Sequence, residues 1–144
     1  AGSIPAGGNF MTRVMVFGTF DVIHPGHIYF LQQAKKYGDF LVVSLAREKF
    51  VRKIKGHSAR HSEAERKKML EALKIVGKVV LGSKTDYVRH ILSLRPNVIV
   101  LGYDQKAFTG KLREKLAARG LRVKIIRARP YKPLIYKSSK LSPR

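Results

Sequence analysis

The sequence predicts an α/β fold, a single Rossmann-like domain with helices on both faces of a five-stranded parallel sheet. Short apolar runs alternate with helix-like segments along the chain, and this order is typical of parallel sheets with crossover helices. A length of 144 residues fits one domain with a sizeable core. We assign residues 11–144 to this domain. Residues 1–10, rich in Gly, Ala and Pro, are expected to be a cloning remnant or a disordered arm.

Five apolar runs are the expected strands. They span residues 13–17, 40–45, 78–82, 97–101 and 121–126. The second run is apolar almost throughout, which favours a strand buried on both faces of the sheet. Right-handed crossovers between parallel strands place a ligand at their carboxyl ends, near the reversal in strand order. The loops after the first and fourth strands are therefore expected to meet at the ligand.

The first expected helix spans residues 28–37. Its spacing predicts that Leu31 and Ala34 face the core together with Ile28, and Tyr37 is a further candidate. Gly38 is placed to end it. Residues 46–61 are basic and lack helical periodicity, so we expect a mobile loop over the site.

A capping box opens the next helix, because Ser62 is followed three residues later by Glu65. We expect this helix to continue to about residue 76, with Arg66 at the surface or, as the less favoured alternative, facing the site. Its expected inward side chains are Met69, Leu70, Leu73 and Val76.

Two further helices complete the pattern. Thr85 or Asp86 can cap a short helix that must stop before Pro96. A basic helix then runs to about residue 119 and is closed by Gly120.

The formal net charge of +21 is extreme and predicts attraction to anions such as nucleotides, phosphorylated metabolites or nucleic acid. The basic residues are dispersed, however, and form no long tract. The absence of cysteine excludes disulfides, thiolate metal sites and a cysteine nucleophile. No apolar run is long enough to cross a membrane, and no signal segment is visible. Cytoplasm is the expected location.

The most informative stretch follows the first strand and reads Gly-Thr-Phe-Asp-Val-Ile-His-Pro-Gly-His, residues 18–27. A helix start offers unpaired backbone N–H groups and a partial positive charge, both of which attract phosphate. Gly18 and Gly26 allow close approach of a ligand, and Pro25 suits the first turn of a helix. His24 and His27 can donate hydrogen bonds to phosphoryl oxygens and stabilise charge that grows at phosphorus. The stretch therefore predicts a phosphate-handling site.

This stretch resembles the signature of the cytidylyltransferase-like nucleotidyltransferases, which carry a His-x-Gly-His motif. The resemblance implies transfer of a nucleoside monophosphate from a triphosphate to an acceptor phosphate, with His24 and His27 as the catalytic residues. It also implies that the nucleotide binds at Gly18, Thr19, Phe20, His24, Pro25, Gly26 and His27. Mg²⁺ is expected to arrive with the triphosphate, held largely by phosphate oxygens and water; no protein metal site is expected.

The resemblance assigns roles to residues outside the signature. Asp104, in Gly-Tyr-Asp-Gln, corresponds to a position beside the nucleotide, and Tyr131 lies in a region that contacts it. The Lys-Ser-Ser-Lys run around Ser138 and Ser139 resembles a second signature that binds the β- and γ-phosphates. Lys53 and Lys55 are candidates for the triphosphate or the acceptor phosphate. His57, His61 and His90 lack metal-ligand spacing.

Within the family the chain resembles two groups of small enzymes, archaeal FAD synthases and glycerol-3-phosphate cytidylyltransferase. The first implies adenylyl transfer from ATP to FMN, and the Gly-Tyr-Asp-Gln and Lys-Ser-Ser-Lys runs favour it. The second, dependent on CTP, stays open. A basic nucleic-acid-binding module without catalysis is the alternative of a different class, predicting strongly salt-dependent binding; we do not expect it. Family members often dimerise, and the helix from Ser62 is a candidate interface.

Overall fold

The computed structural model describes residues 11–56, 60–83, 86–103, 105 and 111–130, with the backbone alone at residues 50 and 53–55. The predictions for residues 1–10 and for Asp104, Tyr131, Ser138 and Ser139 therefore lie outside the described residues. So do the predictions for the side chains of Lys53 and Lys55.

Helices connect the described strands in sequence, as predicted, with two helices between β2 and β3. The strands are β1 (Arg13–Gly18), β2 (Phe40–Leu45), β3 (Lys78–Leu81), β4 (Val98–Leu101) and β5 (Lys124–Arg127). The helices are α1 (Pro25–Lys35), α2 (Glu48–Lys55), α3 (Glu63–Glu71), α4 (Tyr87–Leu94) and α5 (Leu112–Ala118). All strand pairs are parallel and their order is β3-β2-β1-β4-β5. The chain therefore builds the sheet outward from β1 on one side, through β2 and β3, and then on the other side, through β4 and β5. The reversal in strand order lies between β1 and β4.

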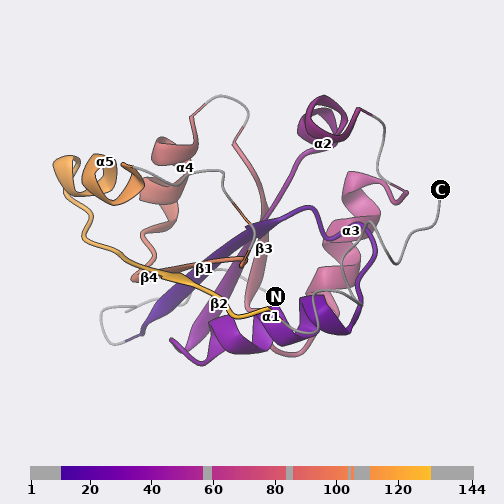
Figure 1. The fold of residues 1–144 in the computed structure, drawn as a ribbon, viewed down its shortest axis with the longest axis horizontal. Helices are drawn as coiled ribbons and strands as arrows, with labels where there is room; N and C mark the ends of the chain where they lie inside the picture. Colours follow the sequence, from indigo (N-terminus) through magenta and orange to yellow (C-terminus); the bar gives the residue numbers. More distant parts are fainter. Residues whose placement is uncertain (1–10, 57–59, 84–85, 104, 106–110, 131–144) are drawn as a thin grey trace.

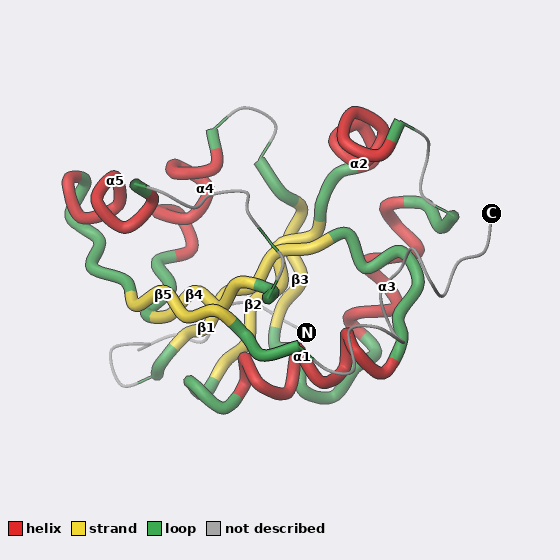
Figure 2. The backbone as a smooth tube through the Cα atoms, in the orientation of Figure 1, coloured by secondary structure: helices red, strands yellow, loops and turns green. Residues whose placement is uncertain are grey.

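Helices cover both faces of this sheet, with α1 and α3 on one face and α4 and α5 on the other (Figures 1 and 2). Alternate residues of β1 serve the two layers, because side chains of a strand point to opposite faces. Val14 and Val16 pack with the α1 and α3 layer. Met15 and Phe17 pack with the α4 and α5 layer. The predicted fold class is confirmed.

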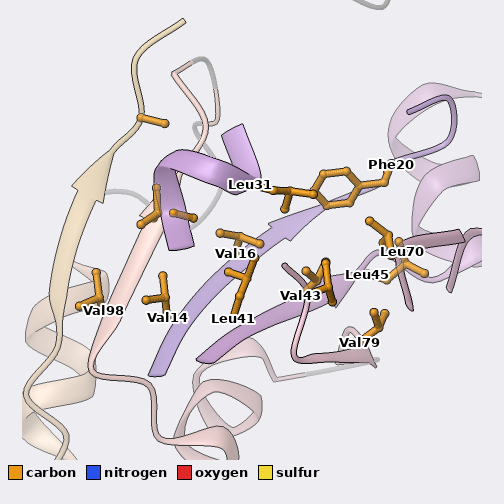
Figure 3. Packing of buried hydrophobic residues seen from close by; sticks show 14 residues of the cluster. Val14, Val16, Phe20, Leu31, Leu41, Val43, Leu45, Leu70, Val79 and Val98 are labelled. Atoms are coloured by element: carbon orange, nitrogen blue, oxygen red, sulfur yellow. The ribbon is translucent and has the colours of Figure 1, made fainter. Parts of the chain in front are cut away.

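The α1 and α3 layer extends to the carboxyl end of β1 through a single aromatic ring. Phe20 is 4% exposed and belongs to the same apolar cluster as Leu31, Leu45 and Leu70. Figure 3 shows its ring beside Leu31, at the end of the cluster nearest Leu45 and Leu70. The loop after β1 is thus anchored in the core.

Two helix boundaries differ from the sequence predictions. α1 ends at Lys35, and Tyr37 is 44% exposed instead of buried. Gly38 does not cap the helix; an added Cβ there would lie 2.6 Å from the Thr12 carbonyl oxygen, so close packing requires glycine. α3 ends at Glu71, after which tight turns carry the chain to Val76.

Leu70 and Val76 are buried as predicted, but two other side-chain directions in this stretch were predicted wrongly. Met69, expected inside, is 37% exposed, whereas Arg66, expected at the surface, is fully buried. Burial of Arg66 is possible because three backbone carbonyls at the carboxyl ends of the strands and before α3 accept its hydrogen bonds. A charged residue with such partners can occupy a position that the apolar pattern would give to Leu or Met.

The basic stretch 46–61 was expected to be a loop, but it contains α2. This helix buries Val51 at 2% exposure and ends at Gly56, which adopts a left-handed conformation with φ of 77°. Phe50, Val51 and Ile54 have helical spacing in the sequence, so the prediction of a loop was wrong although the signal was present. The fifth strand also begins later than predicted, because the Leu121 N–H donates to the Leu116 carbonyl and completes α5.

Candidate nucleotide-binding site

The loop that follows β1 begins with a strained turn. Phe20 has φ of 49°, a left-handed conformation that is rare for a bulky residue. Its ring folds back over Gly18, where an added Cβ would lie 2.5 Å from Phe20 Cε2. Such strain persists only where the surroundings hold it, and it is typical of functional sites. Burial of the Phe20 ring supplies the compensation.

His24 and His27 form a reciprocal cap at the start of α1. The Gly26 N–H donates to His24 Nδ1 at 3.1 Å, and the His24 N–H donates to His27 Nδ1 at 3.3 Å. The two rings stack with centroids 3.9 Å apart, and the Phe20 ring meets His27 edge-on at 5.3 Å. Their spacing, which sequence analysis interpreted as catalytic, therefore also orients both imidazoles.

These bonds determine which imidazole nitrogen can donate. Because each Nδ1 accepts from a backbone N–H, the proton of each neutral ring must lie on Nε2. Partial burial also lowers the pKa of His24 below its ordinary value, which favours the neutral form. Both side chains are thereby fixed as Nε2–H donors.

The start of α1 is suited to an anion. Pro25 occupies the first turn, which contains no acidic residue. The helix dipole therefore acts without an acidic residue in the first turn to oppose it, while the N–H groups of Gly26 and His27 are bonded to His24. An open groove of about 530 Å³ begins here. It is lined by Ile23, His24, Pro25, Ile28, Tyr29 and Gln32.

The second predicted loop follows β4 and lies beside the end of β1. Gln105 Nε2 donates to the Phe17 carbonyl at 2.8 Å, and Gln105 Oε1 accepts from the Gly102 N–H at 2.7 Å. Arg127, at the end of β5, donates to the carbonyls of Gly102 and Gln105. The loop after β4 therefore contacts the carboxyl end of β1 through Gln105, and its convergence on a ligand stays a prediction.

Sequence analysis missed two residues that support the first loop. The buried Arg66 guanidinium donates to the carbonyls of Thr19 and Ala46, at 3.0 and 2.9 Å, and lies 3.7 Å from the Glu48 carboxylate. The Asp21 carboxylate accepts from the N–H groups of Arg60 and His61. These contacts join segments 20 to 47 residues apart. The feature that marks Arg66 is its complete burial, and burial of an arginine cannot be recognised from a single sequence.

Within the described ranges, no group of three or more His, Cys, Asp or Glu could hold a metal ion. Among the same residues, no helix is long and apolar enough to cross a membrane.

A family model described as "Cytidylyltransferase-like" matches residues 15–142. The chain belongs to the cytidylyltransferase-like family. The match contains the whole stretch 18–27, and the predicted membership is confirmed.

Relatives of this cytidylyltransferase-like chain carry a common name. A protein named "FAD synthase" from Aciduliprofundum boonei is 45% identical over 121 residues, covering 84% of this chain and 80% of the relative. An "FAD synthase" from Archaeoglobus fulgidus is 47% identical over 117 residues, covering 80% of this chain and 82% of the relative.

A solved structure is also similar. The "lipopolysaccharide core biosynthesis protein" from Thermoplasma volcanium is 38% identical with a TM-score of 0.79. The match covers 85% of this chain and 99% of that protein. The sheet and helices described above are therefore those of a known α/β fold.

Proposed function

We propose that this chain is an FMN adenylyltransferase that moves AMP from ATP to the phosphate of FMN, giving FAD and pyrophosphate. The observation that carries the proposal is the stacked pair of Nε2–H donors at the start of α1, in a chain 45% identical to a relative named FAD synthase. Nucleotidyl transfer requires hydrogen-bond donors to the oxygens of the reacting phosphate, and the histidine pair supplies them.

In the proposed reaction an FMN phosphate oxygen attacks the α-phosphorus of ATP. The new O–P bond forms as the bond to the β-phosphate breaks, and pyrophosphate leaves with the electron pair. His24 and His27 donate through Nε2 to oxygens on the α-phosphorus, where charge grows. No covalent intermediate with the protein is required, because positioning and electrostatics dominate such transfers.

Other predicted contacts belong to the proposal. Gly18, Thr19 and Phe20 line the nucleotide, and Pro25 and Gly26 bring the start of α1 against its phosphates. The remaining contacts are proposed at residues that the structure does not describe: Asp104 and Tyr131 at the nucleoside, Ser138 and Ser139 at the β- and γ-phosphates, and Lys53 and Lys55 at the triphosphate or the acceptor. Mg²⁺ enters as part of the substrate, bound to ATP.

The test is a screen of purified protein with ATP or CTP against FMN, glycerol 3-phosphate or pantetheine phosphate, in the presence of Mg²⁺. We expect pyrophosphate release and FAD, separated by chromatography, with ATP and FMN alone. Pyrophosphate release confined to CTP and glycerol 3-phosphate would replace the proposed substrates. Tight, salt-dependent binding of nucleic acid with no pyrophosphate release from any pair would contradict an enzymatic function.

We further propose a cytoplasmic location, where a supply of ATP and FMN would meet the enzyme. We also propose a homodimer through the surface of α3, where Met69 is 37% exposed. Light scattering of the wild type and of Met69→Glu measures the oligomeric state. A monomeric wild type would contradict the homodimer.

A further inference from the structure

The pairing of β1 with its two neighbours is unequal. β1 pairs with β2 along its whole length, from Arg13 with Phe40 to Gly18 with Leu45. Its pairing with β4 comprises Val14 with Val98 and Met15 with Ile99, although β4 itself extends to Leu101. β1 and β4 therefore separate toward their carboxyl ends, at the position where strand order reverses.

Backbone groups at this separation face each other without a direct bond. The Gly18 carbonyl accepts from the Ala46 N–H and so points toward β2. Groups of adjacent residues in a strand point to opposite edges, so the Phe17 carbonyl points toward β4. The Gln105 amide lies between that carbonyl and the Gly102 N–H, donating to one at 2.8 Å and accepting from the other at 2.7 Å. The Gln105 side chain thus takes the place of one backbone hydrogen bond between β1 and the chain after β4.

The position of the amide is itself fixed. An added Cβ at Gly102 would lie 3.2 Å from Gln105 Cγ, so glycine lets the side chain fold back over the strand end. Arg127 holds the backbone carbonyls at both ends of the turn, Gly102 and Gln105. The amide therefore acts as a spacer of defined length between the two strands.

We propose that Gln105 is a positioning residue that sets the separation of β1 and β4 and thereby the fit of the nucleoside half of ATP. In open parallel sheets ligands bind in the crevice at this reversal, and the proposed nucleoside contact Asp104 is its sequence neighbour. In the proposed function, His24 and His27 bind the phosphates of the same nucleotide. This inference rests on the proposed function for the identity of the nucleotide.

The spacer requires one donor and one acceptor, which makes a sharp test possible. In Gln105→Glu the carboxylate can accept from the Gly102 N–H but meets the Phe17 carbonyl oxygen with another acceptor. We expect the KM for ATP to rise at least tenfold, with kcat at saturating ATP and the KM for FMN each within threefold of wild type. Protonation of the new carboxyl restores a donor, and a Glu carboxyl ordinarily titrates at about 4.3. The KM ratio of variant to wild type should therefore fall as pH is lowered from 7 to about 5.

Gln33 provides a matched control, because its amide also bridges two backbone groups. It donates to the Arg129 carbonyl at 2.9 Å and accepts from the Arg129 N–H at 3.0 Å, joining α1 to the end of β5. Gln33→Glu should lower the melting temperature as Gln105→Glu does but keep the KM for ATP within twofold. An equal rise of KM in both variants would show general destabilisation and overturn the inference.

Direct binding separates this inference from the proposed function. The Kd for ATP, measured by calorimetry without FMN, should rise at least tenfold in Gln105→Glu. Equal Kd values for wild type and variant would contradict the role of Gln105 and leave the proposed function untouched. A wild type that binds ATP but makes no FAD contradicts the proposed acceptor alone, and the Kd ratio still tests the spacer.

Discussion

The two loops at the site are held in different ways. In the loop after β1 the histidine pair is held by its own neighbours, because His24 and His27 bond within three residues of each other and Phe20 packs on both Gly18 and His27. Distant residues hold the earlier part of this loop, at Thr19 and Asp21. The loop after β4 depends on distant residues, because the Gln105 amide bonds Phe17, 88 positions away, and Arg127 bonds residues 22 and 25 positions away. The proposed catalytic donors are thus built locally, whereas the fit of the nucleoside depends on the sheet.

Removing the donors of the first loop should have the largest effect. In a variant carrying both His24→Ala and His27→Ala, we expect kcat to fall roughly 10³-fold, because hydrogen bonds to the growing charge are lost. Stopped assays of FAD formation measure it. The control is His61→Ala, since its described hydrogen bonds are made by the backbone and not by the imidazole. Unchanged turnover in the double variant would contradict the proposed catalytic role.

Displacing the aromatic support of the first loop should have the next largest effect. In Gly18→Ala the new methyl would meet Phe20 Cε2 at 2.5 Å, and overpacking costs about 1–3 kcal/mol of unfolding free energy. We also expect kcat to fall, because Phe20 packs against His27. Denaturant unfolding and turnover are measured together. Gly82→Ala is the matched control, since the nearest atom to its Cβ lies at 3.4 Å; equal losses would contradict the explanation.

Loosening the second loop should have a smaller effect of a different kind. Arg127→Ala removes two bonds to the loop after β4, so we expect the KM for ATP to rise about three- to tenfold with kcat within twofold. Arg122→Ala removes an equal charge from an exposed position just before β5, and it controls for the loss of attraction to ATP. A fall in kcat larger than the change in KM would contradict the assignment of catalysis to the loop after β1 and of nucleoside binding to the loop after β4.

The smallest expected effect concerns proton binding at the first loop. Burial lowers the pKa of His24, so the unfolded chain binds more protons than the folded chain once pH falls to the ordinary imidazole range. The contribution of His24 to stability is therefore complete above a pH of about 6.5 and is lost as pH drops through and below that value. NMR titration of the free protein, with His24→Gln for assignment, should give a His24 pKa below that of exposed histidines. A higher value would contradict the neutral donor.

The sequence predicted local features well and distant ones poorly. The strand at 40–45, the Ser62–Glu65 capping box and the Asp86 cap each depend on neighbouring residues, and the structure confirms them. The end of α3 was missed because its apolar period is weak, whereas α2 was missed although Phe50, Val51 and Ile54 have helical spacing. Arg66 and Gln105 could not have been assigned, because their partners are brought close only when the strands pair. The histidine pair was recognised because its geometry is set within four residues.

The buried Arg66 has a consequence for how ionic strength should act on this strongly cationic protein. Dissolved ions screen exposed lysines and arginines within about 10 Å at 0.1 M salt, but they have little access to a fully buried guanidinium. Salt should therefore slow the capture of ATP, which depends on the exposed charges. The shape of the loop after β1, which Arg66 holds through the Thr19 carbonyl, should stay the same.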